Sequence, residues 1–380
     1  MKILFVQRMI GISGSELYQM QILPELKKRG YQVEMLIIHS KDGTTANQRM
    51  VSHLSDHNVP VFQLYGNRSM SPLLLIRINR LLKKGNYDIV QTNLIHADLW
   101  LSLVKLFFKR KLKIISVKHG FDEGYTAQYG YDTKYLKKSL FALVQKFSDR
   151  FINYNITISK GLYNLYVDGK ITPKGKIRNI YYGVSLLDKT KNVILRKPEV
   201  KYALILGRLI QCKGHEYVFE AWRTVSAKCK DWKLYIVGSG NYENMLREIV
   251  KTKGLENGVV FCGYQPNPHQ VISDSQFMIV SSISEGFGLI ILEAWLHKKP
   301  VVSFDVPAMN EIIKDNETGF IIPAFDTAKL AEKIIYLFEE KSIVEKCGAA
   351  GYAKLFSYYT VSRMTDETIE VYKMICSPKS

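Results

Sequence analysis

The sequence predicts an α/β protein of two domains, each built around a parallel sheet of the doubly wound kind. The chain has 380 residues, more than a single hydrophobic core usually holds. Apolar strand-like runs alternate with helical patterns of about 10 to 15 residues, which is typical of βαβ units and parallel sheets. This alternation stops before residue 188 and restarts near residue 201, so two such domains follow one another.

The first series of strands and helices begins at the N-terminus. Strands are expected at 2–7, 31–39, 59–65, 87–93 and 113–117, and helices at 15–30, 73–84 and 96–109. The second series repeats the pattern. Its strands are expected at 201–209, 232–237, 259–264, 277–282 and 300–305, with helices at 215–229 and 241–254.

These series define the expected domains. Residues 1–187 form the N-terminal domain, 188–200 a polar, proline-containing linker, and 201–356 the C-terminal domain. The aromatic-rich stretch 357–380 is compatible with a helix, and we expect it to cross back to the N-terminal domain. In doubly wound sheets ligands bind beyond the carboxyl ends of the strands, so we expect the glycine-containing loops at these ends to face one cleft.

The composition excludes several classes of protein. Hydrophobic residues make up 47% and charged residues 23%, as in globular chains. No apolar run approaches the roughly 18 to 20 residues that span a bilayer, and the N-terminus lacks a signal-peptide layout. The five cysteines contain no C-x-x-C pair, which argues against a disulfide framework or a thiolate zinc site. A cytoplasmic protein is expected.

The charge is distributed unevenly. Residues 1–185 hold 28 Lys and Arg against 12 Asp and Glu, a net charge of +16, whereas the remainder has a net charge of only +2. This asymmetry predicts an anionic surface as partner of the first half, and the alternative is a lysine-rich surface that is merely solvated. The segment 134–151, KYLKKSLFALVQKFSDRF, has basic and apolar residues at helical spacing. Such a helix can lie on an anionic bilayer, or it can be an ordinary domain helix with one buried face.

The strongest functional signal is the segment 284–294, SEGFGLIILEA, which follows an expected strand and opens a helix. Its glycines expose backbone N–H groups at a helix N-terminus, which suits hydroxyl or phosphate oxygens. Glu285 lies in the loop and Glu293 two turns further, on a face that can reach the same ligand. A carboxylate there can accept from both hydroxyls of a diol. Alternatively, Glu285 is a helix N-terminal charge and Glu293 a solvated residue.

The second signal is the segment 207–214, GRLIQCKG. Arg208 follows a strand and Lys213 precedes a helix, so both cations can reach one diphosphate and stabilise it as it leaves. As isolated residues, a surface Arg and Lys are more often solvated. The turns at 237–240 and 261–264 are weaker signals, because turn formation alone explains them.

These motifs resemble the G-R-x(4)-K-G and E-x(7)-E motifs of the family-four retaining glycosyltransferases, which have the GT-B fold of two Rossmann-like domains. The likeness extends over essentially the whole chain. It implies that Glu285 contacts the donor sugar, that Glu293 holds the ribose hydroxyls, and that Arg208 and Lys213 bind the diphosphate. Donor contacts at the opening of the helix are implied for the segment Gly286, Phe287, Gly288 and Leu289.

The resemblance implies further site residues. Gly263 and Tyr264 fall where the family's loop meets the nucleobase. Gly14 lies in a glycine-rich loop after the first strand, near the phosphate or acceptor, although the continuation SELY departs from the family's commoner Ala-Glu-Arg-His. His119, at the end of the strand 113–117, falls where the family has a histidine beside the transferred sugar, and we expect it to orient that sugar. A lone histidine is more often structural.

No cofactor is expected beyond the nucleotide sugar. The sequence contains no D-x-D motif, and the two cations Arg208 and Lys213 can neutralise a diphosphate, so a metal ion is not expected. The first loop lacks the complete G-x-G-x-x-G fingerprint of nicotinamide-binding proteins. No nucleic acid is expected as partner, because no aromatic-rich RNA-binding signature is present.

The sequence therefore predicts a hexosyltransferase. It would move a hexosyl or N-acetylhexosaminyl unit, with retention, from a nucleotide-diphosphate sugar, with a UDP-sugar as the expected donor, to a glycan or lipid-linked acceptor in cell-surface polysaccharide or lipopolysaccharide synthesis. The basic half would bind the inner face of the cytoplasmic membrane peripherally. The alternatives are another GT-B enzyme, a sugar-nucleotide epimerase or a phosphorylase, and a non-catalytic basic protein that binds membrane or nucleic acid.

Overall fold

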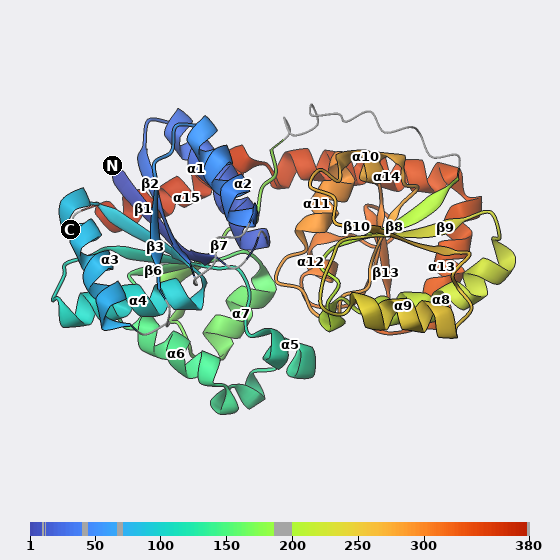
Figure 1. Ribbon diagram of the computed structural model, residues 1–380, viewed down its shortest axis with the longest axis horizontal. Helices are drawn as coiled ribbons and strands as arrows, with labels where there is room; N and C mark the ends of the chain where they lie inside the picture. The colour runs from blue at the N-terminus through green and yellow to red at the C-terminus, as the bar shows by residue number, and fades with distance from the viewer. Residues whose placement is uncertain (10, 12, 40–44, 67–70, 186–199, 378–380) are drawn as a thin grey trace. The chain divides into compact units, whose positions relative to one another are not determined.

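A computed structural model describes residues 1–377 apart from 10, 12, 40–44, 67–70 and 186–199. The chain divides into two compact units. Unit 1 comprises Met1–Gly183 and Val361–Ser380, and unit 2 comprises Val184–Thr360. Each unit contains one sheet whose described strands pair in parallel (Figure 1), which confirms the predicted fold class.

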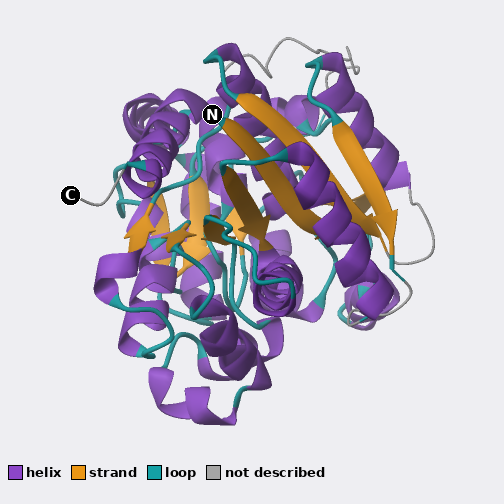
Figure 2. Cartoon of the chain, turned by 90° about the vertical axis from the view of Figure 1, so that its left-hand side faces the viewer, coloured by secondary structure: helices purple, strands orange, loops and turns teal. Residues whose placement is uncertain are grey.

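The sheet of unit 1 has seven strands in the order β3-β2-β1-β4-β5-β6-β7. The change of direction between β1 and β4 makes it doubly wound, with helices on both faces (Figure 2). Its strands are β1 Lys2–Met9, β2 Gln32–His39, β3 Val61–Tyr65, β4 Ile89–Asn93, β5 Ile114–Lys118, β6 Tyr154–Thr157 and β7 Ile177–Asn179.

The helices of unit 1 include every helix expected from the first series. They are α1 Gly14–Lys28, α2 Thr45–Asp56, α3 Pro72–Gly85, α4 Leu94–Phe107, α5 Glu123–Tyr129, α6 Leu140–Asp149, α7 Lys160–Asp168 and α15 Val361–Cys376, with 3-10 turns η1 Thr133–Lys138 and η2 Lys174–Lys176. Helices α1, α2 and α15 lie on one face of the sheet and α3, α4 and α6 on the other (Figure 1).

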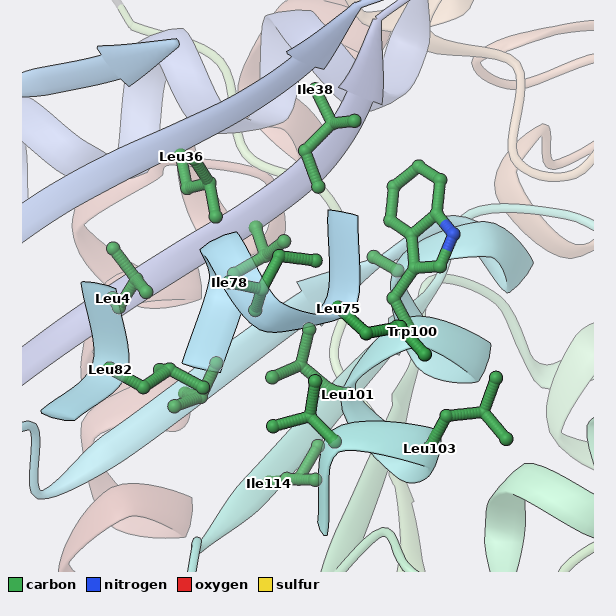
Figure 3. Close-up of a cluster of buried hydrophobic side chains, with 14 of the residues drawn as sticks. Leu4, Leu36, Ile38, Leu75, Ile78, Leu82, Trp100, Leu101, Leu103 and Ile114 are labelled. Carbon is green, nitrogen blue, oxygen red and sulfur yellow. The ribbon is translucent and has the colours of Figure 1, made fainter. Parts of the chain in front are cut away.

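Helix α3 shows how the sequence pattern becomes structure. Pro72 begins the helix, where its missing N–H is not needed, and Asn86 ends it in the left-handed conformation. Its buried leucine and isoleucine side chains pack on Leu36 and Ile38 of the sheet and beside Trp100 of α4 (Figure 3). Its basic side chains remain on the exposed face, so the positive charge of this helix does not enter the core.

The segment 134–151 differs from the single amphipathic helix that the sequence predicts. It divides into the 3-10 turn η1 and the helix α6, which are separated by Ser139. Ser139 has an extended backbone, and its hydroxyl accepts a hydrogen bond from the amide of Ala142 at 3.2 Å. A serine in this position is an N-cap, which starts a new helix and cannot continue the previous one.

The sheet of unit 2 has six strands in the order β10-β9-β8-β11-β12-β13. They are β8 Tyr202–Leu206, β9 Lys233–Val237, β10 Val259–Gly263, β11 Met278–Val280, β12 Val301–Phe304 and β13 Gly319–Ile322. The helices are α8 His215–Lys228, α9 Glu243–Thr252, α10 His269–Asp274, α11 Leu289–Leu296, α12 Met309–Ile312, α13 Thr327–Glu339 and α14 Lys341–Tyr358, preceded by the 3-10 turn η4 Gln211–Lys213.

The end of the chain belongs to unit 1. Helix α14 lies in unit 2 and α15 in unit 1, so the chain passes between the units a second time at residues 360–361. Arg29, which caps the C-terminus of α1, donates to the hydroxyl of Ser362 at 2.8 Å and forms an ion pair with Asp366. The expected linker, 188–200, lies outside the described residues except for residue 200. In the described part of the chain, no helix has both the length and the apolar character needed to cross a membrane.

Candidate functional site

The predicted residues of unit 2 lie at the carboxyl ends of neighbouring strands. The segment 207–214 follows β8, Gly263 and Tyr264 end or follow β10, and the segment 284–288 follows β11. Since β8 pairs with β9 and β11, and β9 pairs with β10, these loops share one edge of the sheet. Parallel α/β sheets bind their ligands at this edge.

Two glycines after β9 support the loop that carries Arg208. A Cβ atom on Gly238 would lie 1.8 Å from the carbonyl oxygen of Gly207, and one on Gly240 would lie 2.1 Å from that of Leu209. No side chain fits in either space. The sequence indicated only that the chain changes direction at 237–240. The glycines of this turn are also required because they allow two loops to lie in close contact.

The two strongest motifs meet in an ion pair between Lys213 and Glu285. The Lys213 ammonium donates to Oε1 of Glu285, and the hydroxyl of Ser282 donates to the same oxygen at 2.7 Å. The neighbouring Ser281 donates from its hydroxyl to the main-chain carbonyl of Lys213 at 2.8 Å. Two consecutive serines at the end of β11 thus hold both charged residues, and the sequence motifs gave no indication of this.

Main-chain contacts join the same two loops. The amide of Ile283 donates to the carbonyl of Cys212 at 2.9 Å. Gly214 has a φ of +62°, and a Cβ atom there would lie 2.2 Å from the carbonyl oxygen of Ser281. Only glycine meets both requirements at this position. The loops therefore form a single unit, which we call the Lys213–Glu285 clamp, made of residues 212–214 and 281–285.

The start of α11 presents main chain to the same edge of the sheet. Gly288 has a φ of +84°, and a Cβ atom there would meet the end of the Met309 side chain at 2.4 Å. Phe287 is buried and packs against Tyr359, with ring centroids 6.0 Å apart. Leu289 is the first residue of α11, and Gly286 is half-buried. Because the Phe287 ring points into the core, only its main chain is available to a ligand.

The other predicted residues of unit 2 lie in the loop after β8, on α11, and at the end of β10. Arg208 is exposed, in the loop that also carries Lys213, and Glu293 is half-buried on α11, two turns after Glu285. Gly263 ends β10 with a φ of +67°, and its carbonyl accepts from the amide of Gly238 at 2.9 Å. Tyr264 follows it and is 58% exposed, so its ring is open to solvent.

In unit 1, Gly14 begins α1 at the end of β1. The hydroxyl and amide of the preceding Ser13 both donate to Oε2 of Glu16, at 2.6 and 2.9 Å, which closes a capping box. Glu16 also accepts from Ser15 at 2.9 Å and is almost completely buried. Glu16, which the family's Ala-Glu-Arg-His pattern also has, thus serves here in the cap of α1.

His119 follows β5 in unit 1, and other residues occupy both of its ring nitrogens. Nε2 lies 2.9 Å from Oδ1 of Asn93, which ends β4, and Nδ1 contacts the hydroxyl of Tyr182. Burial, and secondly the charge of Lys118, lower the pKa of His119 to about 3. The imidazole is therefore neutral at physiological pH.

A buried ion pair lies beside His119. Lys118 is 3% exposed and its ammonium lies 2.6 Å from Oδ2 of the fully buried Asp98. The same ammonium donates to Oε1 of Gln145 at 2.8 Å, and the hydroxyl of Thr92 donates to Oδ1 of Asp98. The pair fixes the end of β5, and hence the position from which His119 extends. No sequence signal indicated this pair, because Lys118 is one of many lysines in the first half of the chain.

Comparison with known proteins relates both halves of the chain to one enzyme class. Residues 12–186 match the model of Glycosyltransferase Family 4, and residues 188–354 match that of Glycosyl transferases group 1. One curated relative is the alpha-D-kanosaminyltransferase of Streptomyces kanamyceticus, 26% identical over 174 residues, or 45% of this chain and 45% of that protein. Another is the poly(ribitol-phosphate) alpha-N-acetylglucosaminyltransferase of Staphylococcus aureus, 24% identical over 168 residues, or 44% of this chain and 34% of that protein.

Both matches cover only a third to a half of the relative's length. A solved structure resembles the whole chain. The crystal structure of Anabaena Alr3699/HepE in complex with UDP-glucose has a TM-score of 0.81 and 19% sequence identity, and the comparison covers 98% of this chain and 99% of that one. At this identity the likeness shows a common fold.

His215, next to the clamp, makes unit 2 sensitive to acid. It is buried, and both of its ring nitrogens lack a hydrogen-bond partner in the described structure. Its burial, and secondly the positive charge of Lys213, lower the pKa of His215 to about 4. Between the ordinary pKa of 6.5 and about 4, the unfolded chain takes up a proton that the folded chain excludes, so stability falls as the pH falls through this window.

We expect the free energy of unfolding to be lower at about pH 5 than at neutral pH, and His215 to account for on the order of 2 kcal/mol of this decrease. Urea unfolding at neutral pH and at about pH 5 measures the loss. His215→Leu should reduce it, whereas His57→Asn, at an exposed histidine, should not. An equal loss in the wild type and in His215→Leu would contradict the prediction.

Proposed function

Since the chain belongs to the GT-B glycosyltransferases, with residues 12–186 in glycosyltransferase family 4 and 188–354 in glycosyl transferases group 1, we propose that it is a hexosyltransferase that uses a nucleotide-diphosphate sugar. The proposed donor is a UDP-sugar, carrying a hexosyl or N-acetylhexosaminyl unit. The observation that carries the proposal is the Lys213–Glu285 clamp, where a cation and a carboxylate meet on adjoining loops at the carboxyl edge of the unit 2 sheet.

The clamp suits a donor that is charged at one end and hydroxylated at the other. Lys213 would exchange its partner Glu285 for the diphosphate, with Arg208 as a second cation in the same loop. Glu285 would keep its hydrogen bond from Ser282 and accept from a sugar hydroxyl. Glu293, on α11, would accept from the ribose hydroxyls, while Gly263 and Tyr264 lie where the nucleobase would bind.

The proposed reaction is a front-face displacement, in which the acceptor oxygen approaches the anomeric carbon from the side that the diphosphate leaves. The bond between the anomeric carbon and the diphosphate oxygen breaks, and the negative charge that develops on the leaving diphosphate is stabilised by Lys213 and Arg208. The acceptor oxygen forms the new bond to the anomeric carbon, and its proton passes to the leaving diphosphate. His119, being neutral, would orient the sugar. Retention is supported by the alpha linkage in the names of both relatives, for a donor whose sugar is itself alpha-linked.

We propose that no metal ion takes part, because the two cations of the loop 207–214 can neutralise the diphosphate. The acceptor would be a glycan or lipid-linked glycan of the cell surface. The relative from Staphylococcus aureus, by its name, transfers N-acetylglucosamine to poly(ribitol-phosphate), which supports a polymer as the acceptor. Nucleic acid has no part in the proposal.

A membrane-bound acceptor would explain the charge of unit 1. Helix α6 exposes Leu140 and Leu143, at 75% and 55%, on one side, and the adjoining turn η1 exposes Lys134 and Lys137. Apolar side chains next to cations are suited to the surface of an anionic bilayer. We therefore propose peripheral binding at the inner face of the cytoplasmic membrane.

Loss of either charge of the clamp should abolish donor turnover. We expect UDP-glucose or UDP-N-acetylglucosamine to raise the melting temperature of the wild type. Lys213→Ala should remove this shift, and both Lys213→Ala and Glu285→Gln should lower turnover of the donor by about a hundredfold or more. Lys228→Ala, at the exposed far end of α8, is the control.

Mass spectrometry of the products separates the alternatives. Transfer to an acceptor, or release of the unaltered sugar, supports the proposal, whereas an isomerised sugar formed without acceptor indicates an epimerase. Failure to bind any nucleotide sugar would refute the proposed function. Turnover should be the same with and without EDTA if no metal takes part.

Ser282 should matter for catalysis because it holds Glu285. We expect Ser282→Ala to lower kcat for the donor by about tenfold, as for the loss of one hydrogen bond to a charged group, while KM changes little. Ser303→Ala is the matched control, since Ser303 is equally buried and lies in the neighbouring strand β12. An unchanged kcat in Ser282→Ala would show that the hydrogen bond from Ser282 is not needed to position Glu285.

Membrane binding should depend on charge and on the two leucines. We expect the protein to sediment with phosphatidylglycerol vesicles at low salt and to be released by high salt, because surface charges are screened. The double variant Leu140→Ser/Leu143→Ser should bind less tightly. Met245→Ser, at a residue of unit 2 that is 53% exposed, is the control. If anionic vesicles fail to retain the wild type, the membrane proposal is wrong.

A further inference from the structure

Helix α15 carries three buried residues at intervals of four. Met364, Thr368 and Tyr372 therefore lie along one side of the helix, and all three are at most 2% exposed. We call them the α15 stripe. Apolar packing alone would not require a hydroxyl at two of these positions, since a buried hydroxyl must be hydrogen-bonded to be tolerated.

The stripe contacts polar groups of the unit 1 core. The hydroxyl of Tyr372 donates to Oε1 of Gln91 on β4. The Nε2 atom of Gln91 donates in turn to the hydroxyl of Tyr18 on α1, at 3.4 Å, and Thr368 also hydrogen-bonds to Tyr18. Tyr18 is thus held by two hydrogen bonds, one to the stripe and one to the glutamine that the stripe orients.

Met364, the third member of the stripe, contacts the residue that follows Tyr182 in the chain. The amide of Gly183 points to the sulfur of Met364, with a nitrogen to sulfur distance of 3.3 Å. Gly183 directly follows Tyr182 in the chain, so this contact fixes the main chain from which the Tyr182 ring projects.

Tyr18 and Tyr182 are the two aromatic rings that border His119. The Tyr18 ring meets the His119 ring edge-on, with centroids 5.1 Å apart, and the Tyr182 ring stacks on it at 5.7 Å. The two tyrosine rings also contact each other, with centroids 5.6 Å apart. The Tyr182 hydroxyl occupies Nδ1 of His119. The His119 ring can therefore turn only if one of these tyrosines moves.

We propose that α15 is a positioning element for His119: the stripe Met364, Thr368 and Tyr372 fixes Tyr18 and Tyr182, and these fix the imidazole. The role of His119 in catalysis rests on the proposed function, whereas its placement by α15 does not. The last helix of the chain would thus complete a site built by the first half. None of the three stripe residues contacts His119 directly, so they are positioning residues and not catalytic ones.

A simpler explanation is that α15 only stabilises unit 1. The two explanations differ in what happens to the His119 ring when one hydroxyl of the stripe is removed. Under the positioning proposal the ring signals shift, and water reaches the imidazole. Because burial is the main cause of its low pKa, the pKa of His119 then rises from about 3 towards 6.5.

The chain offers a matched pair of variants on α15. Thr365 and Thr368 are both completely buried, and each donates its hydroxyl to a carbonyl four residues earlier, at 2.7 Å. Only Thr368 belongs to the stripe. Thr368→Val and Thr365→Val therefore remove the same group, and the same bond to the helix backbone, from the same helix. Tyr372→Phe is a third variant, which keeps the ring and removes the hydroxyl.

The test is NMR of the full-length protein labelled with ¹⁵N-histidine, with His119→Gln used to assign the His119 signals. We expect Thr368→Val and Tyr372→Phe to shift these signals and raise the pKa of His119, and Thr365→Val to leave both unchanged. Unchanged signals in Thr368→Val and Tyr372→Phe, or the same change in Thr365→Val, would overturn the proposal. If Thr368→Val does not fold, Tyr372→Phe decides.

Turnover of UDP-glucose provides the functional readout. We expect the two stripe variants to lower kcat by about tenfold, as for a misplaced active-site group, while the donor-induced rise in melting temperature stays that of the wild type. If the wild type neither binds nor turns over a nucleotide sugar, the proposed function fails, and the NMR result still decides whether α15 positions His119.

Discussion

The ion pair between Lys213 and Glu285 is the interaction on which the architecture of unit 2 depends. Both side chains are partly withdrawn from water, and such charges are tolerated only when they are paired and hydrogen-bonded. The pairing requires two loops from non-consecutive strands to lie in contact, which is possible because Gly214 brings no side chain against Ser281. The glycines at this edge of the sheet therefore determine how closely the charged residues of the two loops can approach each other.

The sequence was sufficient to predict the elements and residues whose signal is local. The alternation of apolar strands and amphipathic helices predicted both parallel sheets, and the spacing of Lys213 and Glu285 behind their strands predicted that they share an edge. The short strands β6 and β7 escaped prediction, because their polar residues interrupt the apolar pattern, whereas the equally short β11 and β12 are marked by apolar runs. The break between η1 and α6 was missed as well, since the cap at Ser139 competes with a helical pattern that continues on both sides.

The supporting contacts could not be predicted, because they join residues far apart in the sequence. Ser281 and Lys213 are 68 positions apart, and Tyr372 and Gln91 are 281 positions apart. A serine, glutamine or tyrosine is unremarkable until the fold gives it a partner. Lys118 illustrates the opposite case, because in a sequence so rich in lysine nothing distinguishes the one buried beside Asp98 from those in solvent. Motifs indicate the candidate site residues, whereas the topology of the fold determines which residues contact and support them.

The two units hold their key groups in opposite electrostatic states. In unit 2, Lys213 and Glu285 form an ion pair, and under the proposed function a diphosphate would replace Glu285 as the partner of Lys213, so that one ion pair is exchanged for another without leaving a cation unpaired. In unit 1, burial and the neighbouring Lys118 lower the pKa of His119 and keep it uncharged, within a half of the chain that is basic. A charged imidazole would add a further cation with no anion of its own. A neutral ring held by Asn93 and Tyr182 contributes shape and hydrogen bonding alone, and its orientation therefore matters more than its acidity.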